Sequence, residues 1–280
     1  MYPNDVQENL EKAVAFYEKR ISEMPLRTDT EKLRIRERVT GNIAKLKELG
    51  PINILILGDS VSHGCFGGYG IGNDYHAAYH NRLRLYIQRA HQTTPVNILN
   101  YAVGGEVSSF GDRIFEDRVV PHHPDLVVVC FGLNDVNHSL PDYVSSLEGI
   151  FGKCAVHGFD CVLLTPNMLN TRRAEGTVGM YWDYAQKTAD MQNGGRMDSF
   201  IEAAKEVAEA HGVPVCDAYA LWKEMEAAGI DITLLLANRI NHPLPEMHDL
   251  FARLLFKTVF GEEPKGHIGR ADDGMTDAAR

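Results

Sequence analysis

The chain has 280 residues, of which 44% are hydrophobic and 24% are charged, and its formal net charge at pH 7 is -10. This length and composition are typical of a globular enzyme with a sizeable buried core. An acidic chain lacks the basic patch that nucleic acids and anionic lipids require, so we expect it to bind neither nucleic acid nor a membrane.

The first twenty residues contain four acidic side chains and lack the uninterrupted apolar stretch of a secretory signal. No run reaches the roughly 18 apolar residues of a membrane span. We therefore expect a cytoplasmic protein. The five cysteines are irregularly spaced and no pair has zinc-ligand spacing, so we expect buried free thiols in a reducing compartment.

Residues 1–50 are predicted to form an N-terminal helical extension. Apolar side chains recur at spacings of three and four residues over 5–24, as in an amphipathic helix. A second helical pattern runs from about residue 29 to 49 and is stopped by Gly50 and Pro51. This pair of helices either packs on the main domain as a hairpin or serves as a substrate rim or as the contact of a homo-oligomer.

From Ile52 onward, predicted strands and helices alternate. The apolar run INILILG is typical of a strand buried on both faces. Further strands are predicted at 96–103, 125–132, 161–166 and 213–218, and helices near 75–91, 108–119, 142–157, 195–211 and 244–260. The alternation predicts a three-layer α/β/α sandwich with a short parallel, flavodoxin-like sheet over residues 51–262. Residues 263–280 are predicted to be a polar tail.

Two connections interrupt this pattern. Residues 65–74 are rich in glycine but match no phosphate-binding motif, and we expect them to form a mobile loop. Residues 167–194 are too long for an ordinary connection and carry Tyr181, Trp182 and Tyr184. They are predicted to be a substrate-binding loop, with a helical surface excursion as the alternative.

Two of the segments that could carry chemistry lie near the start and the end of the alternating region. Ser60 follows the first predicted strand and opens a helix, where backbone N–H groups can hold an anion, although a helix N-cap explains the serine equally well. His242 precedes Pro243 at the start of the last predicted helix. The positive end of a helix dipole would favour the neutral imidazole that a general base needs.

Two further segments each follow a predicted strand. Gly104 and Gly105 come after Asn100, and glycines there let the backbone approach a ligand closely. Asn134 lies in Gly132-Leu133-Asn134-Asp135, and its side-chain amide could donate to an oxyanion. Either segment is also compatible with an ordinary turn.

In this order, the four segments resemble the SGNH hydrolases, the family of GDSL-type lipases, esterases and acylhydrolases. Gly58-Asp59-Ser60 matches the serine block, and Gly105 stands five residues after Asn100 as the glycine block requires. Gly132 to Asp135 match Gly-x-Asn-Asp, and His242-Pro243 match the final block. The resemblance covers about residues 51–260.

The resemblance implies a role for each block. Ser60 would be the nucleophile and His242 the general base. The backbone N–H groups of Ser60 and Gly105 and the amide of Asn134 would form the oxyanion hole. No cofactor and no metal are expected. His76 and His80 have metal-ligand spacing, but they lack the neighbouring glutamate of a zincin.

One position departs from the family pattern. The family usually has an aspartate three residues before the histidine, where this chain has Arg239, preceded by Asn238. We expect a backbone carbonyl near Arg239 to orient the imidazole, so that both residues contribute the position of the chain more than side-chain chemistry. The alternatives are an acid from elsewhere, such as Asp231 or Glu246, or a poor catalyst.

The sequence therefore predicts a serine ester hydrolase that works through an acyl-enzyme. We expect a small-molecule ester as substrate, such as an acetyl group on a carbohydrate, because aromatic rings like Trp182 pack on sugar faces. The alternatives are an acylhydrolase of the lysophospholipase or thioesterase kind and a catalytically weak sugar-binding protein.

Overall fold

The computed structural model describes residues 2–26, 30–40, 43–266 and 268. Its centre is a parallel sheet of five strands in the order β4-β1-β5-β6-β7. The strands are β1 (Ile52–Gly58), β4 (Val96–Asn100), β5 (Leu126–Cys130), β6 (Asp160–Leu164) and β7 (Val215–Cys216). All five predicted strands are confirmed, although most are shorter than the apolar runs that predicted them.

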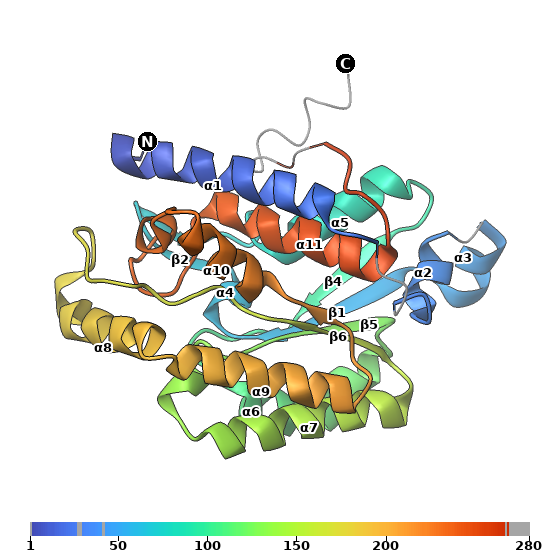
Figure 1. Ribbon diagram of the computed structural model, residues 1–280. Coiled ribbons are helices and arrows are strands. Elements are labelled where there is room, and N and C mark those ends of the chain that lie inside the picture. The colour runs from blue at the N-terminus through green and yellow to red at the C-terminus, as the bar shows by residue number, and fades with distance from the viewer. Residues whose placement is uncertain (1, 27–29, 41–42, 267, 269–280) are drawn as a thin grey trace.

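Helices cover both faces of the sheet, which confirms the three-layer architecture (Figure 1). In this view α1, α5 and α11 lie above the sheet, and α6, α7 and α9 lie below it. Helix α10 packs against α1 and α11. Their bounds are α1 (Asn4–Glu23), α5 (Tyr79–Ala90), α6 (Ser108–Ile114), α7 (Leu140–His157), α9 (Arg196–Ala210), α10 (Ala218–Ala227) and α11 (His248–Phe260).

Shorter elements connect the layers. The helices are α2 (Arg34–Val39), α3 (Ile43–Leu49), α4 (Ser60–His63) and α8 (Trp182–Asn193). The single turns are η1 (Phe115–Val119), η2 (Val120–His122), η3 (Asp135–Asn137), η4 (Gly179–Tyr181), η5 (Ile232–Leu235) and η6 (Pro245–Met247). A small hairpin pairs β2 (Cys65–Gly68) with β3 (Ile71–Asn73).

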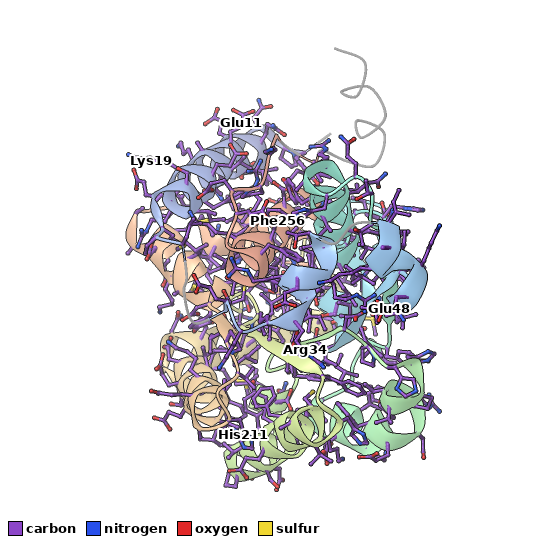
Figure 2. The ribbon with its side chains drawn as sticks, turned by 90° about the vertical axis from the view of Figure 1, so that its right-hand side faces the viewer. Glu11, Lys19, Arg34, Glu48, His211 and Phe256 are labelled. Atoms are coloured by element: carbon purple, nitrogen blue, oxygen red, sulfur yellow. The ribbon has the colours of Figure 1, made fainter. Side chains whose placement is uncertain are left out.

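Helix α1 forms as the periodicity predicts, and its apolar stripe is buried against α10, α11 and η5. The buried side chains of this stripe are Val6, Leu10, Ala13, Tyr17 and Ile21. Figure 2 shows Glu11 and Lys19 on the opposite, outer side of the helix. The stripe is therefore covered by the chain itself.

Three predictions need correction. The second helical pattern is divided between α2 and α3, and at the end of α2 the Thr40 hydroxyl donates to the Arg36 and Glu37 carbonyls. Residues 65–74 contain the β2–β3 hairpin where a loop was expected. Residues 167–194 end in a helix, α8, so the segment is an irregular loop and a helical excursion together.

The described residues bear on two further expectations. The cysteines are free thiols, of which Cys65 is half-buried and the other four are buried. No helix in the described part of the chain has both the length and the apolar character that crossing a membrane requires. The predicted tail at 263–280 lies mostly outside the described residues.

The packing of α1 predicts that it contributes to the stability of the whole domain. Leu10→Ala should lower the free energy of unfolding in a urea titration by about 2–5 kcal/mol, because Leu10 is buried and its truncation leaves a cavity. The matched control is Glu11→Ala on the exposed side, with an expected change within about 0.5 kcal/mol. Equal, small effects of both variants would show that α1 is dispensable for the fold.

Candidate active site

Ser60 lies where the central strand β1 ends and the short helix α4 begins. Asp59 caps α4, since its carboxylate accepts a hydrogen bond from the Val61 N–H at 3.0 Å. Gly64 ends the helix with φ of 94°, a left-handed conformation that glycine adopts freely. This tight strand-to-helix turn holds the serine at the carboxyl edge of the sheet, where parallel sheets bind their ligands.

His242 meets Ser60 although 182 positions separate them in the chain. The His242 Nε2 atom lies 2.8 Å from the Ser60 Oγ atom. The helix predicted near 244–260 is present as η6 and α11, but His242 does not open it and lies in an irregular segment before η6. Burial, and not a helix dipole, lowers the pKa of His242 to about 4, and the hydrogen bond to Phe66 opposes the shift.

A backbone carbonyl faces the other nitrogen of the imidazole. The Phe66 oxygen lies 3.2 Å from His242 Nδ1, so the acceptor comes from the β2–β3 hairpin and not from the chain near Arg239. A carbonyl can only accept, so Nδ1 carries the hydrogen and Nε2 presents its lone pair to Ser60. Sequence reasoning missed Phe66, because a backbone carbonyl belongs to every residue and leaves no signal in the sequence.

The two acids considered as replacements bind elsewhere. Asp231 pairs with Arg172 at 2.7 Å and accepts from the Leu234 N–H at the start of η5. Glu246 accepts a hydrogen bond from the Tyr2 hydroxyl at 2.9 Å. Because Ser60 and Phe66 face the two ring nitrogens of His242, neither acid orients the imidazole in this structure.

Asn238 contributes more than the position of its backbone, contrary to the expectation from the sequence. Its Oδ1 atom accepts hydrogen bonds from the backbone N–H groups of Ile240, Asn241 and His242, each at 3.0 Å. The side chain of Asn238 thus holds together the turn that carries His242. The Arg239 side chain turns away from the imidazole, toward Tyr69 and the carbonyls of the preceding loop.

The glycine block lies against the serine. A Cβ atom placed on Gly104 would be only 3.7 Å from the Ser60 Cβ, and the Gly104 N–H donates to His63 Nδ1 at 3.1 Å. Gly105 follows with φ of 84°. The residue before the sequence-predicted glycine is therefore next to Ser60, and Gly105 itself has a backbone conformation that few other residues adopt.

Asn134 is tied to the same loop. Its amide nitrogen donates one hydrogen to the Glu106 carbonyl at 2.9 Å, which leaves the second amide hydrogen for another acceptor. Asp135 strengthens the connection, because its carboxylate accepts from the Ser108 N–H at 2.8 Å and the Gly132 N–H at 3.0 Å. The structure thus brings the serine, glycine and asparagine segments together at one edge of the sheet.

The predicted aromatic loop lies farther out. Tyr181 and Trp182 are 47% and 42% exposed, and the Arg173 guanidinium lies 5.2 Å from the centre of the Trp182 ring. The Tyr184 hydroxyl accepts from Asn137, which follows the asparagine block. Farther back in the same loop, the Glu175 carbonyl accepts from Arg239, so the loop borders the turn that carries His242.

His76 and His80, which have metal-ligand spacing, lie in different environments. His80 is buried in α5, its Nε2 atom lies 3.1 Å from the Ser62 carbonyl, and burial lowers its pKa to about 4. His76 is exposed in the turn before that helix. Within the described parts of the chain, no three His, Cys, Asp or Glu side chains gather as metal ligands would.

Several solved structures share this fold at low sequence identity. An acetylxylan esterase from Geobacillus stearothermophilus is 18% identical with a TM-score of 0.59, over 77% of this chain and 97% of that one. A lipase/acylhydrolase from Enterococcus faecalis is 21% identical with a TM-score of 0.57, over 77% and 100%. An α/β hydrolase from the metagenome of Lake Arreo, Spain, is 21% identical with a TM-score of 0.58, over 76% and 97%.

These likenesses show that the chain has the same α/β fold as these proteins. In this chain a serine and a histidine meet at the carboxyl edge of the sheet. The family is shown by the sequence itself, since the GDSL-like lipase/acylhydrolase family matches residues 56–250. The chain belongs to this family and is a carboxylic ester hydrolase. Curated protein sequences give no match.

The turn around Asn238 yields a prediction about ester hydrolysis. Asn238→Ala removes the acceptor of three backbone N–H groups. If that loss costs about 1–3 kcal/mol in the transition state, kcat/KM should fall by roughly 5–150-fold. Asn238→Asp retains the acceptor oxygen and should retain more activity. Asn97→Ala, which removes an exposed amide bonded to Asn53, is the control. A change below about 3-fold in Asn238→Ala would contradict the role of this side chain.

Proposed function

We propose that Ser60 and His242 form a catalytic dyad that hydrolyses esters through an acyl-enzyme. The observation that carries the proposal is the contact between His242 Nε2 and Ser60 Oγ at 2.8 Å, with a carbonyl acceptor at Nδ1. In that arrangement the imidazole has a lone pair on the nitrogen that faces the serine proton.

The reaction follows from these positions. Ser60 Oγ attacks the ester carbonyl as its proton passes to His242 Nε2, and the tetrahedral intermediate collapses when that proton is returned to the leaving alcohol. Water then enters, gives its proton to His242 and attacks the acyl-enzyme. Collapse of the second intermediate returns the proton to Ser60 and releases the acid.

The negative charge of each intermediate needs hydrogen-bond donors. The N–H groups of Ser60 and Gly105 and the second amide hydrogen of Asn134 are the donors that we assign to the oxyanion. Their proximity supports the assignment, because the glycine loop lies against Ser60 and bonds Asn134 through Glu106. Donors fixed by the fold before the reaction need no reorganisation when the charge develops.

A dyad with a carbonyl acceptor has a specific consequence. A carbonyl stabilises the charged imidazolium less than a carboxylate does, and burial disfavours that charge further. With a pKa of about 4, His242 is neutral near pH 7 and available as a base, but it is a weak one. We therefore expect an active enzyme with modest turnover.

We propose acetyl groups on a carbohydrate, or a similar small ester, as the substrate. Trp182 is 42% exposed and the Arg173 guanidinium lies over one face of its ring, so the ring and the cation together suit a sugar face and its hydroxyl groups. The similar fold of an acetylxylan esterase is compatible with this choice. A longer acyl group, as in a lysophospholipid or thioester, is the second candidate, because Val178 and Met180 extend the exposed apolar surface.

The dyad predicts equal losses of kcat in the two variants that remove its members, and a pH profile with a low acidic midpoint. Ser60→Ala and His242→Ala should each lower kcat by roughly 10³-fold or more, since the two residues act as a unit. A fluorophosphonate should label the wild type at Ser60. Because the neutral imidazole is the active form, kcat/KM should be constant near neutral pH and fall only as the pH approaches about 4. Retained activity in folded Ser60→Ala protein would contradict this mechanism, and a fall in kcat/KM centred at the ordinary value of 6.5 would contradict the lowered pKa of His242.

The substrate proposal predicts a split between binding and turnover. Trp182→Ala should raise KM for an acetylated xylo-oligosaccharide by about 10-fold or more and leave kcat for nitrophenyl acetate nearly unchanged, because the ring contributes uniform binding. Tyr101→Phe, which removes only a hydroxyl bonded to His122, is the control. A series of nitrophenyl esters that favours long acyl chains would support the second candidate instead.

A further inference from the structure

The hairpin that carries the Phe66 carbonyl has little stability of its own. Its strands β2 and β3 have four and three residues, and their register shifts between Cys65 and Gly68. An isolated two-stranded hairpin is marginally stable at best in water. The position of the Phe66 oxygen therefore depends on what holds the hairpin against the rest of the protein.

One contact is a close approach of two backbones. A Cβ atom placed on Gly68 would fall 1.9 Å from the Ala237 carbonyl oxygen, and one on Gly67 would fall 3.5 Å from His242 Nδ1. Only glycine at position 68 permits this approach. The hairpin thus lies directly on the segment that presents His242.

The second contact is at the hairpin tip. The Arg239 guanidinium lies 5.1 Å from the centre of the Tyr69 ring, and its Nη2 group donates to the Tyr69 hydroxyl. A cation over an aromatic face is attracted by the ring quadrupole, most strongly where water is excluded. Arg239 is 3% exposed, so this pair is largely desolvated on the arginine side.

Arg239 is itself rigidly held. Its Nη1 group donates to the carbonyls of Leu234 and Leu236 at 3.0 and 2.7 Å, and its backbone has φ of 63°. A buried cation and a left-handed arginine are both unfavourable, and such features persist only where the surroundings enforce them. Tyr69 has φ of 53°, so the same kind of strain is present on both sides of the contact.

The N-terminal extension supports the tip from outside. The Tyr2 ring packs edge-on against the Tyr69 ring, with centroids 4.9 Å apart, and its hydroxyl donates to Glu246. Residue 2 lies outside the part of the chain that the family matches. Tyr69 at the hairpin tip therefore contacts Arg239 on one side and the extension on the other, although the residue remains 38% exposed.

We propose that Arg239 and Tyr69 position the β2–β3 hairpin so that the Phe66 carbonyl holds the His242 imidazole in its reactive tautomer. This inference rests on the proposed catalytic dyad. Arg239 stands at the position where the family usually has the aspartate that contacts the histidine. In this chain Arg239 does not contact the histidine and acts on it through the Tyr69 ring and the Phe66 carbonyl.

The test compares the wild type with Tyr69→Ala, Tyr69→Phe and Arg239→Lys, with rates expressed per active site titrated by a fluorophosphonate. Tyr69→Ala and Arg239→Lys should lower kcat for nitrophenyl acetate by roughly 10–100-fold, the scale of a small misplacement of a reacting group, with little change in KM. In these variants, the pH at which kcat/KM falls on the acidic side should move up from about 4 toward 6.5, because water reaches the imidazole. Tyr69→Phe retains the ring and should recover part of the rate.

A second pair in the protein supplies the control. The Arg253 guanidinium of α11 lies 5.4 Å from the centre of the Tyr86 ring of α5, and Tyr86 donates to Asp249. Tyr86→Phe and Arg253→Lys should lower the melting temperature without moving the acidic limb. If the Tyr69 and Arg239 variants behave in the same way as these controls, their role is structural only and the proposal is wrong.

The imidazole tautomer gives a readout that does not depend on activity. Nitrogen-15 spectra of the ring, with the His242 signals assigned from a His242→Gln variant, should show the Nδ1–H form in the wild type and a mixture in Tyr69→Ala and Arg239→Lys. An unchanged tautomer in both folded variants overturns the positioning role. A wild type that neither hydrolyses esters nor reacts with the fluorophosphonate, yet shows these tautomer changes, overturns the proposed dyad and leaves the positioning role standing.

Discussion

The hydrogen bond between the Phe66 carbonyl and the His242 ring is the contact on which the site depends. Ser60 and the residues near Gly105 and Asn134 follow neighbouring parallel strands, so the sheet itself brings them to one edge. His242 comes from an irregular segment with no such support. An acceptor on its ring is needed to choose one tautomer and one orientation, and a carbonyl serves because it has lone pairs and no hydrogen.

The site depends on parts of the chain inside the family match and on parts outside it. The serine, glycine, asparagine and histidine segments lie within the matched residues 56–250, whereas α1 lies before them. Yet α1 is packed into the core along its whole apolar stripe, and the chain just before it places Tyr2 on the hairpin tip. The extension therefore bears on the geometry of the site as well as on the stability of the fold.

Most of the fold could be predicted because its signals are local. Apolar runs predicted the five strands, and apolar spacings of three and four predicted α1. The β2–β3 hairpin could not be predicted, because glycines such as Gly67 and Gly68 suggest a loop unless the backbone packed against them is known. Helix α10 was missed as well, since its pattern follows the last short strand without a clear break.

By itself, the sequence determined the family, the parallel sheet and the residues that meet at its edge, because each of these follows from residue type and local order. It also showed that no carboxylate stands three residues before His242. What takes the place of that carboxylate depends on how the folded chain packs. The acceptor is a main-chain oxygen of Phe66, and Tyr69 and Arg239 are brought together across 170 positions of the chain. Such contacts depend on how distant segments pack, and residue identity alone does not encode them.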